Sequence, residues 1–105
     1  MTHAFHPDDR VLVLQPESYS ASLLREWARA LTGGVLVGLG APGTIGTVRR
    51  ELADCENVLF VRGSREEIPW RDDFFTVIVD TPGGTDTPEI RRVLHPSGRI
   101  YSIQP

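Results

Sequence analysis

Lysine is absent from this 105-residue chain, so all 11 of its basic residues are arginines. Acidic residues outnumber them, and the net charge is −3 at pH 7. A surface that binds nucleic acid normally needs a basic patch, which this charge balance does not favour. We therefore expect no nucleic-acid partner.

Cysteine is nearly absent, since Cys55 is the only one. A single cysteine excludes an intramolecular disulfide and fits a reducing compartment. Long apolar runs are also missing: none reaches the ~18 residues of a membrane span, and the first ten residues lack the layout of a signal peptide. The three histidines, His3, His6 and His95, form no cluster with metal-ligand spacing. We expect a cytoplasmic protein with no membrane partner and no metal site.

Short apolar runs alternate with helical patterns along the chain. Continuous apolar runs typical of buried strands occupy 10–15, 35–39, 57–61, 74–80 and 99–104. Helical patterns occupy 18–34, capped by Ser18 or Ser20, then 43–54, and 87–94 with Thr87 as cap. Polar connections are expected at 62–73 and 81–86, and a turn at 95–98.

This order predicts a parallel sheet with right-handed crossovers, in the doubly wound three-layer α/β class. The whole chain, 1–105, is expected to be one domain, with 1–8 a flexible N-terminus. The connection 62–73 is polar and the helix at 87–94 is short. One face of the sheet should therefore be thinly covered, which favours a partner on that face.

The second half of the chain carries the texture of a known family. The segments "NVLFVRGSREEIPWRDDFFTVIVD" and "PEIRRVLHPSGRIY" resemble class I S-adenosylmethionine-dependent methyltransferases. The resemblance implies a minimal Rossmann-like domain with a five-stranded, mostly parallel sheet in the order 3-2-1-4-5. It stops at the fifth strand of the family, so Arg99–Gln104 should form an exposed edge. Proteins normally cover such edges. We therefore expect a homodimer or a hetero-complex that covers this strand or the thin face.

The cofactor-binding positions of that family are altered in this chain. Its three glycines after the first strand correspond to Gln15, Glu17 and Tyr19. Its acidic ribose ligand corresponds to Gly40, and its adenine-reading Asp corresponds to Ser64. Each lost polar contact costs ~1–3 kcal/mol, so conventional S-adenosylmethionine binding should be impaired. The resemblance thus favours a non-catalytic assembly or small-ligand-binding module without a cofactor. The alternative is a genuine methyltransferase, or a subunit of one, that binds S-adenosylmethionine through an unusual cofactor loop.

A second motif, G-x-G-x-x-G, is formed by Gly38, Gly40 and Gly43. It is typical of loops that bind dinucleotides, and nearby arginines would suit NADP or another nucleotide. The competing interpretation is a glycine-permitted turn into a helix. A small anion at Gly43, Thr44 and Ile45 is a further hypothesis, because a helix N-terminus offers free N–H groups.

Asp80 ends the fourth expected strand, at the sheet edge where α/β folds place functional groups. We assign no catalytic residue from the sequence, and Asp80 is the best single candidate for a polar functional residue. The competing interpretation is an aspartate that caps the following loop, "TPGGTD".

Overall fold

The computed structural model describes residues 5–104, and residues 1–4 and 105 lie outside the description. Five strands form one sheet: β1 (Arg10–Leu14), β2 (Val35–Gly40), β3 (Val58–Arg62), β4 (Phe75–Asp80) and β5 (Leu94–Ser102). The helices are η1 (Pro16–Ser18), α1 (Ala21–Ala30), α2 (Pro42–Glu51) and α3 (Pro88–Val93). The strand order is β3-β2-β1-β4-β5, and all four neighbouring pairs are parallel. The expected α/β fold and sheet order are therefore confirmed.

The helix starts follow the local capping signals. The Ser20 hydroxyl accepts a hydrogen bond from the Leu23 amide at the start of α1. Thr87 does the same for the Ile90 amide at the start of α3, with Pro88 at the first helical position. Of the two cap candidates for α1, Ser20 is the one used.

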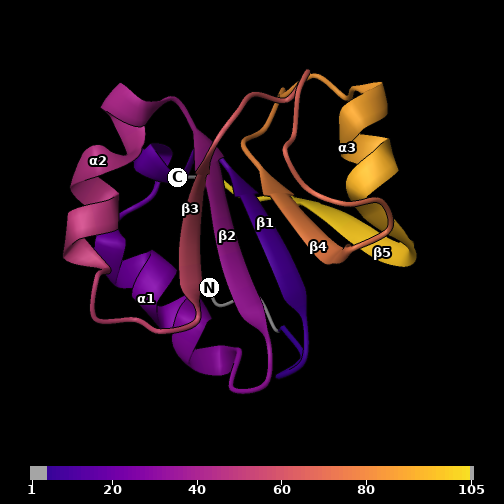
Figure 1. The fold of residues 1–105 in the computed structure, drawn as a ribbon. Helices are drawn as coiled ribbons and strands as arrows, with labels where there is room; N and C mark the ends of the chain where they lie inside the picture. The colour runs from indigo at the N-terminus through magenta and orange to yellow at the C-terminus, as the bar shows by residue number, and fades with distance from the viewer. Residues whose placement is uncertain (1–4, 105) are drawn as a thin grey trace.

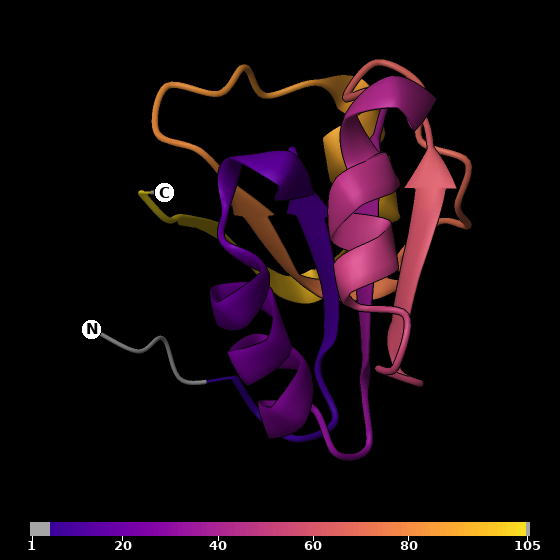
Figure 2. The same ribbon diagram turned by 90° about the vertical axis from the view of Figure 1, so that its left-hand side faces the viewer.

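The two faces of the sheet are covered unequally. Helices α1 and α2 pack on one face, as both ribbon views show, and α3 alone packs on the other (Figure 1, Figure 2). The connection between β3 and β4 contributes cover on the α3 face by burying Ile68 and packing Trp70 against the core. Arg92 of α3 holds this connection by donating to the Ile68 and Trp70 carbonyls. A loop fixed by side-chain hydrogen bonds thus occupies the place of a helix.

The exposure of one row of side chains shows how completely the α3 face of the sheet is covered. Register partners place one residue from each strand side by side across the α3 face: Leu59, Val37, Leu12, Ile78 and Ile100. The three central residues are fully buried, whereas Leu59 is 47% exposed and Ile100 is 36% exposed. These are the exposed large hydrophobics of the described residues. The face is therefore open at its two edges and closed at its centre.

The end of the chain differs from the sequence expectation. The segment 95–98 was expected to be a turn, with a strand at 99–104. Strand β5 instead begins at Leu94 and ends at Ser102, with a register irregularity opposite Phe75 and Val77. Pro96 and Gly98 are accommodated because β5 is an edge strand, where a bulge disturbs only one neighbour.

The N-terminal segment is partly packed. Of the expected flexible residues 1–8, residues 1–4 lie outside the described residues. Phe5 is buried and packs against Trp27 and Tyr101. The Pro7 carbonyl accepts a hydrogen bond from the Gly33 amide. The ordered part of the fold therefore begins before β1.

Candidate functional site at the carboxyl ends of the strands

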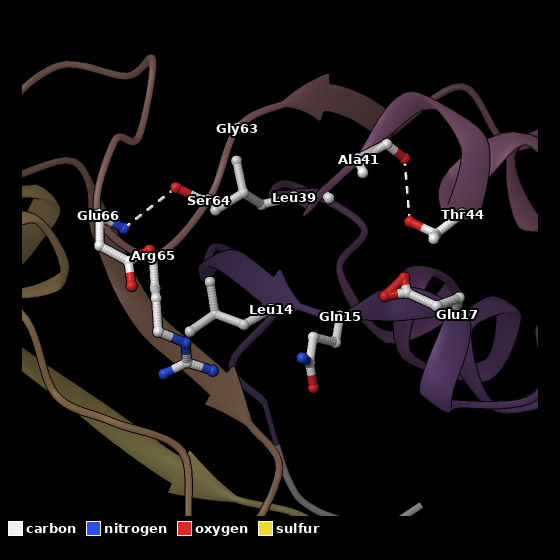
Figure 3. Close-up of a pocket in the computed structure, with 11 residues that line it drawn as sticks. Leu14, Gln15, Glu17, Leu39, Ala41, Thr44, Gly63, Ser64, Arg65 and Glu66 are labelled. Atoms are coloured by element: carbon white, nitrogen blue, oxygen red, sulfur yellow. Dashed lines mark hydrogen bonds between the residues drawn. The ribbon is translucent and has the colours of Figure 1, made fainter.

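A pocket of about 390 Å³ opens where β1, β2 and β3 end. Its size lies within the range of small-molecule sites. Figure 3 shows side chains from three connections turned around this space. The lining residues are Leu14, Gln15, Glu17, Leu39, Gly40, Ala41, Thr44, Gly63, Ser64, Arg65 and Glu66.

Four of the five positions singled out by the family resemblance line this pocket: Gln15, Glu17, Gly40 and Ser64. Parallel strands bring their carboxyl ends to one edge of the sheet, so residues far apart in sequence meet there. The fifth, Tyr19, does not line it. Of the three side chains that stand where the family has glycines, only Gln15 and Glu17 therefore line the pocket.

Tyr19 turns into the core instead. Its ring is buried and lies 5.4 Å from the Trp27 ring, centroid to centroid. Its hydroxyl donates to the Ile103 carbonyl at 2.6 Å. Burial, followed by the negative charge of Asp80, raises the pKa of Tyr19 to about 12. Tyr19 thus connects the segment after η1 to the residue that follows β5.

Gln15 keeps a backbone conformation that glycine favours. Its φ of 56° and ψ of 59° lie in the left-handed region, where a Cβ is strained. Its amide donates to the Leu39 carbonyl of β2. The turn after β1 therefore retains a sharp left-handed step although its glycine is missing, and the Gln15 side chain lies at the pocket wall.

The end of β2 has no room for an acidic side chain. A Cβ added at Gly40 would lie 2.7 Å from Ile45 Cγ2, which is too close for a carbon contact. Ile45 is buried, so it has little freedom to withdraw. The same Cβ would lie 3.6 Å from Glu17 Oε2. A carboxylate is thus present beside the end of β2, but it comes from η1.

The glycine motif spans the end of β2 and the first turn of α2. Gly38 lies inside β2, where an added Cβ would lie 2.7 Å from the Phe60 ring. Close packing between strands therefore explains Gly38. Only Ala41 separates the end of β2 from the start of α2. Gly43, in the first turn of α2, has open space around it.

The hypothetical anion site at the start of α2 has few free donors. The Thr44 and Ile45 amides both donate to the Ala41 carbonyl, and the Thr44 hydroxyl donates to it as well. The Glu17 carboxylate faces this helix start across the pocket (Figure 3). These contacts disfavour a bound anion there.

Asp80 is held in an ion pair that the local sequence does not predict. Arg65 Nη1 lies 3.1 Å from Asp80 Oδ2, and Arg65 Nη2 lies 2.9 Å from Asp80 Oδ1. Both side chains are largely buried, at 17% and 10% exposure. Arg65 also donates to the Thr85 carbonyl, and Asp80 accepts from the Thr81 amide. The contacts are those of a loop-holding aspartate, the competing interpretation of this residue.

The ion pair stands between two pockets. Arg65 lines the 390 Å³ pocket, and Asp80 lines a second pocket of about 150 Å³ beside α3 and β5. Leu14 lines both. Arg65 is one of the arginines that the sequence offered for a nucleotide, but its pairing with a residue 15 positions later appears only in the fold.

Among residues 5–104, no group of three or more His, Cys, Asp or Glu side chains could hold a metal ion. His3 lies outside the described residues. In the same part of the chain, no helix is long and apolar enough to cross a membrane.

Solved structures with this arrangement of strands and helices include proteins that are named as methyltransferases. YcgJ from Bacillus subtilis superimposes with a TM-score of 0.72 at 22% identity, over 90% of this chain. A SAM-dependent methyltransferase from Aquifex aeolicus gives 0.71 at 16% identity, over 87% of this chain. A Haloferax volcanii putative methyltransferase in complex with the Trm112 activator gives 0.68 at 22% identity, over 90%.

The fold is that of S-adenosylmethionine-dependent methyltransferases. At these sequence identities, the similarity to methyltransferases shows the fold alone. The chain spans 43% of the YcgJ chain, 53% of the Aquifex chain and 43% of the Haloferax chain. No protein-family model matches the sequence, and no curated protein matches it.

Proposed function

We propose that this methyltransferase-like domain is a non-catalytic module that binds a small molecule in the 390 Å³ pocket. The observation that carries the proposal is the Arg65–Asp80 ion pair between the two pockets. Group transfer requires the two reacting atoms to approach within about 3–3.5 Å of each other. A ligand in one pocket and a ligand in the other would have the ion pair between them.

The polar contacts at the pocket also support the proposal. The resemblance assigns an acidic ligand to the position of Gly40, which has no side chain and no room for one. It assigns another to Ser64, whose hydroxyl accepts from the Glu66 amide at 3.3 Å. Two acceptors that would orient an adenosyl group are therefore absent. Because unpaired polar groups lower affinity by several kcal/mol in sum, S-adenosylmethionine should bind weakly.

One observation favours the alternative, a genuine methyltransferase or a subunit of one. Tyr19 lies in the core, so the pocket is open rather than filled. For that activity the Arg65–Asp80 pair would have to separate. The nucleotide alternative at Gly38–Gly43 has no such support, because Gly38 is a strand residue and the carboxylates of Glu17 and Glu66 line the pocket.

Calorimetric titration of the full chain separates these functions. S-adenosylmethionine, S-adenosylhomocysteine and NADP are titrated in parallel, with thermal shift as a second readout. We expect dissociation constants in the millimolar range or no binding for all three. Micromolar binding of the first two would overturn the non-catalytic proposal, and micromolar binding of NADP alone would favour the nucleotide alternative.

We further propose that the domain assembles with a partner or a second copy along β5. The support is that β5 is an edge strand and that Ile100 is 36% exposed on the less covered face. The Haloferax structure of similar fold is a complex with an activator protein. A partner of that kind, or a second copy of this chain, would cover both the strand edge and Ile100.

A further inference from the structure

The charges around the 390 Å³ pocket do not cancel. Glu17 and Glu66 line it as acidic residues, and Arg65 is the basic residue among its lining side chains. The positive charge of Arg65 is matched by Asp80, which holds both of its terminal nitrogens. Asp80 also raises the pKa of Arg65 further above its ordinary value. The pocket therefore carries an excess of negative charge.

Glu17 supplies one of these negative charges and is positioned to contact a ligand in the pocket. It belongs to η1, whose entry is fixed by the left-handed step at Gln15 and by Pro16. Figure 3 shows its carboxylate turned toward Ala41 and Thr44, into the space between the ends of β1 and β2. Within residues 5–104 this carboxylate has no ion-pair partner and accepts no hydrogen bond. It is a free acceptor at the wall of a cavity.

Part of the pocket lining is apolar. Leu14 and Leu39, at the ends of β1 and β2, contribute to the lining although each is almost completely buried. Gly40, Ala41 and Gly63 add backbone and a methyl group rather than polar side chains. A ligand that contacts both Glu17 and the two leucines needs an apolar body as well as a polar head.

The charge of the pocket favours an organic cation as that polar head. An anion would approach Glu17 and Glu66 against charge repulsion. A metal ion needs several ligands, and no group of three candidate side chains exists within residues 5–104. An ammonium group needs only one carboxylate and can leave its carbon body on the leucines.

We propose that the pocket binds a small organic cation with an apolar body, its charged head held by Glu17 and its body against Leu14 and Leu39. This inference rests on the proposed small-ligand function. It adds the charge class of the ligand and the residue that selects it.

Three probes of matched shape test the inference: phenethylammonium, 2-phenylethanol and phenylacetate, which are cationic, neutral and anionic. Each is titrated into the full-length chain while amide NMR shifts are recorded. We expect the cation to shift the amides of Glu17, Thr44 and Ser64 and to bind at least about threefold more tightly than the alcohol. The anion should bind most weakly, and high salt should reduce the difference.

Two variants assign the preference to Glu17. Glu17→Gln removes the charge and should bring cation and alcohol to equal affinity. Glu26→Gln removes one charge on α1, away from the lining residues, and should leave the preference unchanged. If Glu17 only stabilised the nearby start of α2, Glu17→Gln would lower the melting temperature without altering the preference.

The outcomes separate the two proposals. Equal binding of the three probes at the pocket amides would overturn the cation inference and leave the small-ligand function standing. Shifts confined to other amides, or none, would overturn both. Because S-adenosylmethionine carries a sulfonium, millimolar binding of it is expected from charge alone, and only micromolar binding contradicts the proposed function.

Discussion

Arg65 and Asp80 meet through two parallel hydrogen bonds of 3.1 and 2.9 Å, joining the β3–β4 connection to the end of β4. Planar two-point pairing of this kind is specific to arginine, because lysine offers a single charged centre. The Arg65 backbone carbonyl also accepts a hydrogen bond from Thr87, which caps α3. One residue thus ties together both loops that border the two pockets.

Loss of Arg65 should destabilise the fold strongly. Arg65→Met leaves the largely buried Asp80 carboxylate without its partner, which costs about 3–5 kcal/mol of unfolding free energy. Asp80→Asn should cost less in the Arg65→Met background than in the native one. Urea denaturation of the native protein, the two single variants and the double variant measures the coupling energy between Arg65 and Asp80, which we expect to be about 1–3 kcal/mol. Coupling near zero would show that the pair does not act as a unit. Arg65→Lys is the milder substitution, because lysine keeps a single charged centre.

Restoring an acid at Gly40 should fail for steric reasons. Gly40→Asp places a Cβ 2.7 Å from Ile45 Cγ2, so we expect a loss of about 1–3 kcal/mol in stability. Gly43→Ala is the matched control, because nothing lies within 4 Å of a Cβ there. It should stabilise α2 by about 0.5–1 kcal/mol. Thermal unfolding followed by circular dichroism compares the two, and a stable Gly40→Asp protein would contradict the crowding.

Gln15 should tolerate glycine better than any other residue. Its left-handed backbone, with φ of 56°, costs about 1–2 kcal/mol for a residue with a Cβ. Gln15→Gly is therefore expected to be as stable as the native protein or more stable by about 1 kcal/mol. Gln15→Val should be less stable, because a β-branched side chain is the least compatible with this conformation. Denaturant midpoints rank the three, and the reverse order would argue against a strained turn.

The free energy of unfolding should fall in alkaline solution, because Tyr19 ionises less readily in the folded chain than in the unfolded chain. Its pKa is raised from 10.0 to about 12 in the folded chain, mainly by burial. Between these values the unfolded state has released the proton and the folded state still holds it, so unfolding becomes easier as the pH rises. Tyr19→Phe should flatten this decline, at the cost of the hydrogen bond to Ile103, about 1 kcal/mol. Tyr101→Phe is the control, and an unchanged alkaline slope in Tyr19→Phe would assign the decline to other groups.

Assembly along β5 should be visible in sedimentation velocity at micromolar concentration. We expect a mass above that of the monomer for the chain with itself, or with an added partner. Ile100→Glu should reduce it, because the charge lies at the exposed end of the apolar row on β5. Leu59→Glu changes the opposite end of the same row, on β3, and should have no effect. If the native chain is a clean monomer, a second copy is excluded as the partner.

The amino-acid order by itself determined the sheet and its helices. Continuous apolar runs such as Val11–Leu14 and Val77–Val79 predict buried parallel strands, since both faces of such strands are covered. Capping signals predicted α3 at Thr87 and Pro88. These features are readable because they depend on neighbours in the chain. The segment 95–98 is expected to be a turn because of Pro96 and Gly98; in the structure it lies within β5, between the register pairs Phe75–Leu94 and Val77–Arg99, and has no register partner of its own in β4.

Only the tertiary structure decided what the site residues do. The family pattern placed Gln15, Glu17 and Tyr19 together in one cleft, but a short 3₁₀ turn directs Glu17 to the pocket and Tyr19 into the core. Gly38 and Gly40 look alike in the sequence, yet the Phe60 ring leaves no room for a side chain at Gly38, and Ile45 leaves none at Gly40. The partner of Asp80 came from a different loop. Side-chain direction and long-range pairing follow from packing across strands, and local sequence does not contain that information.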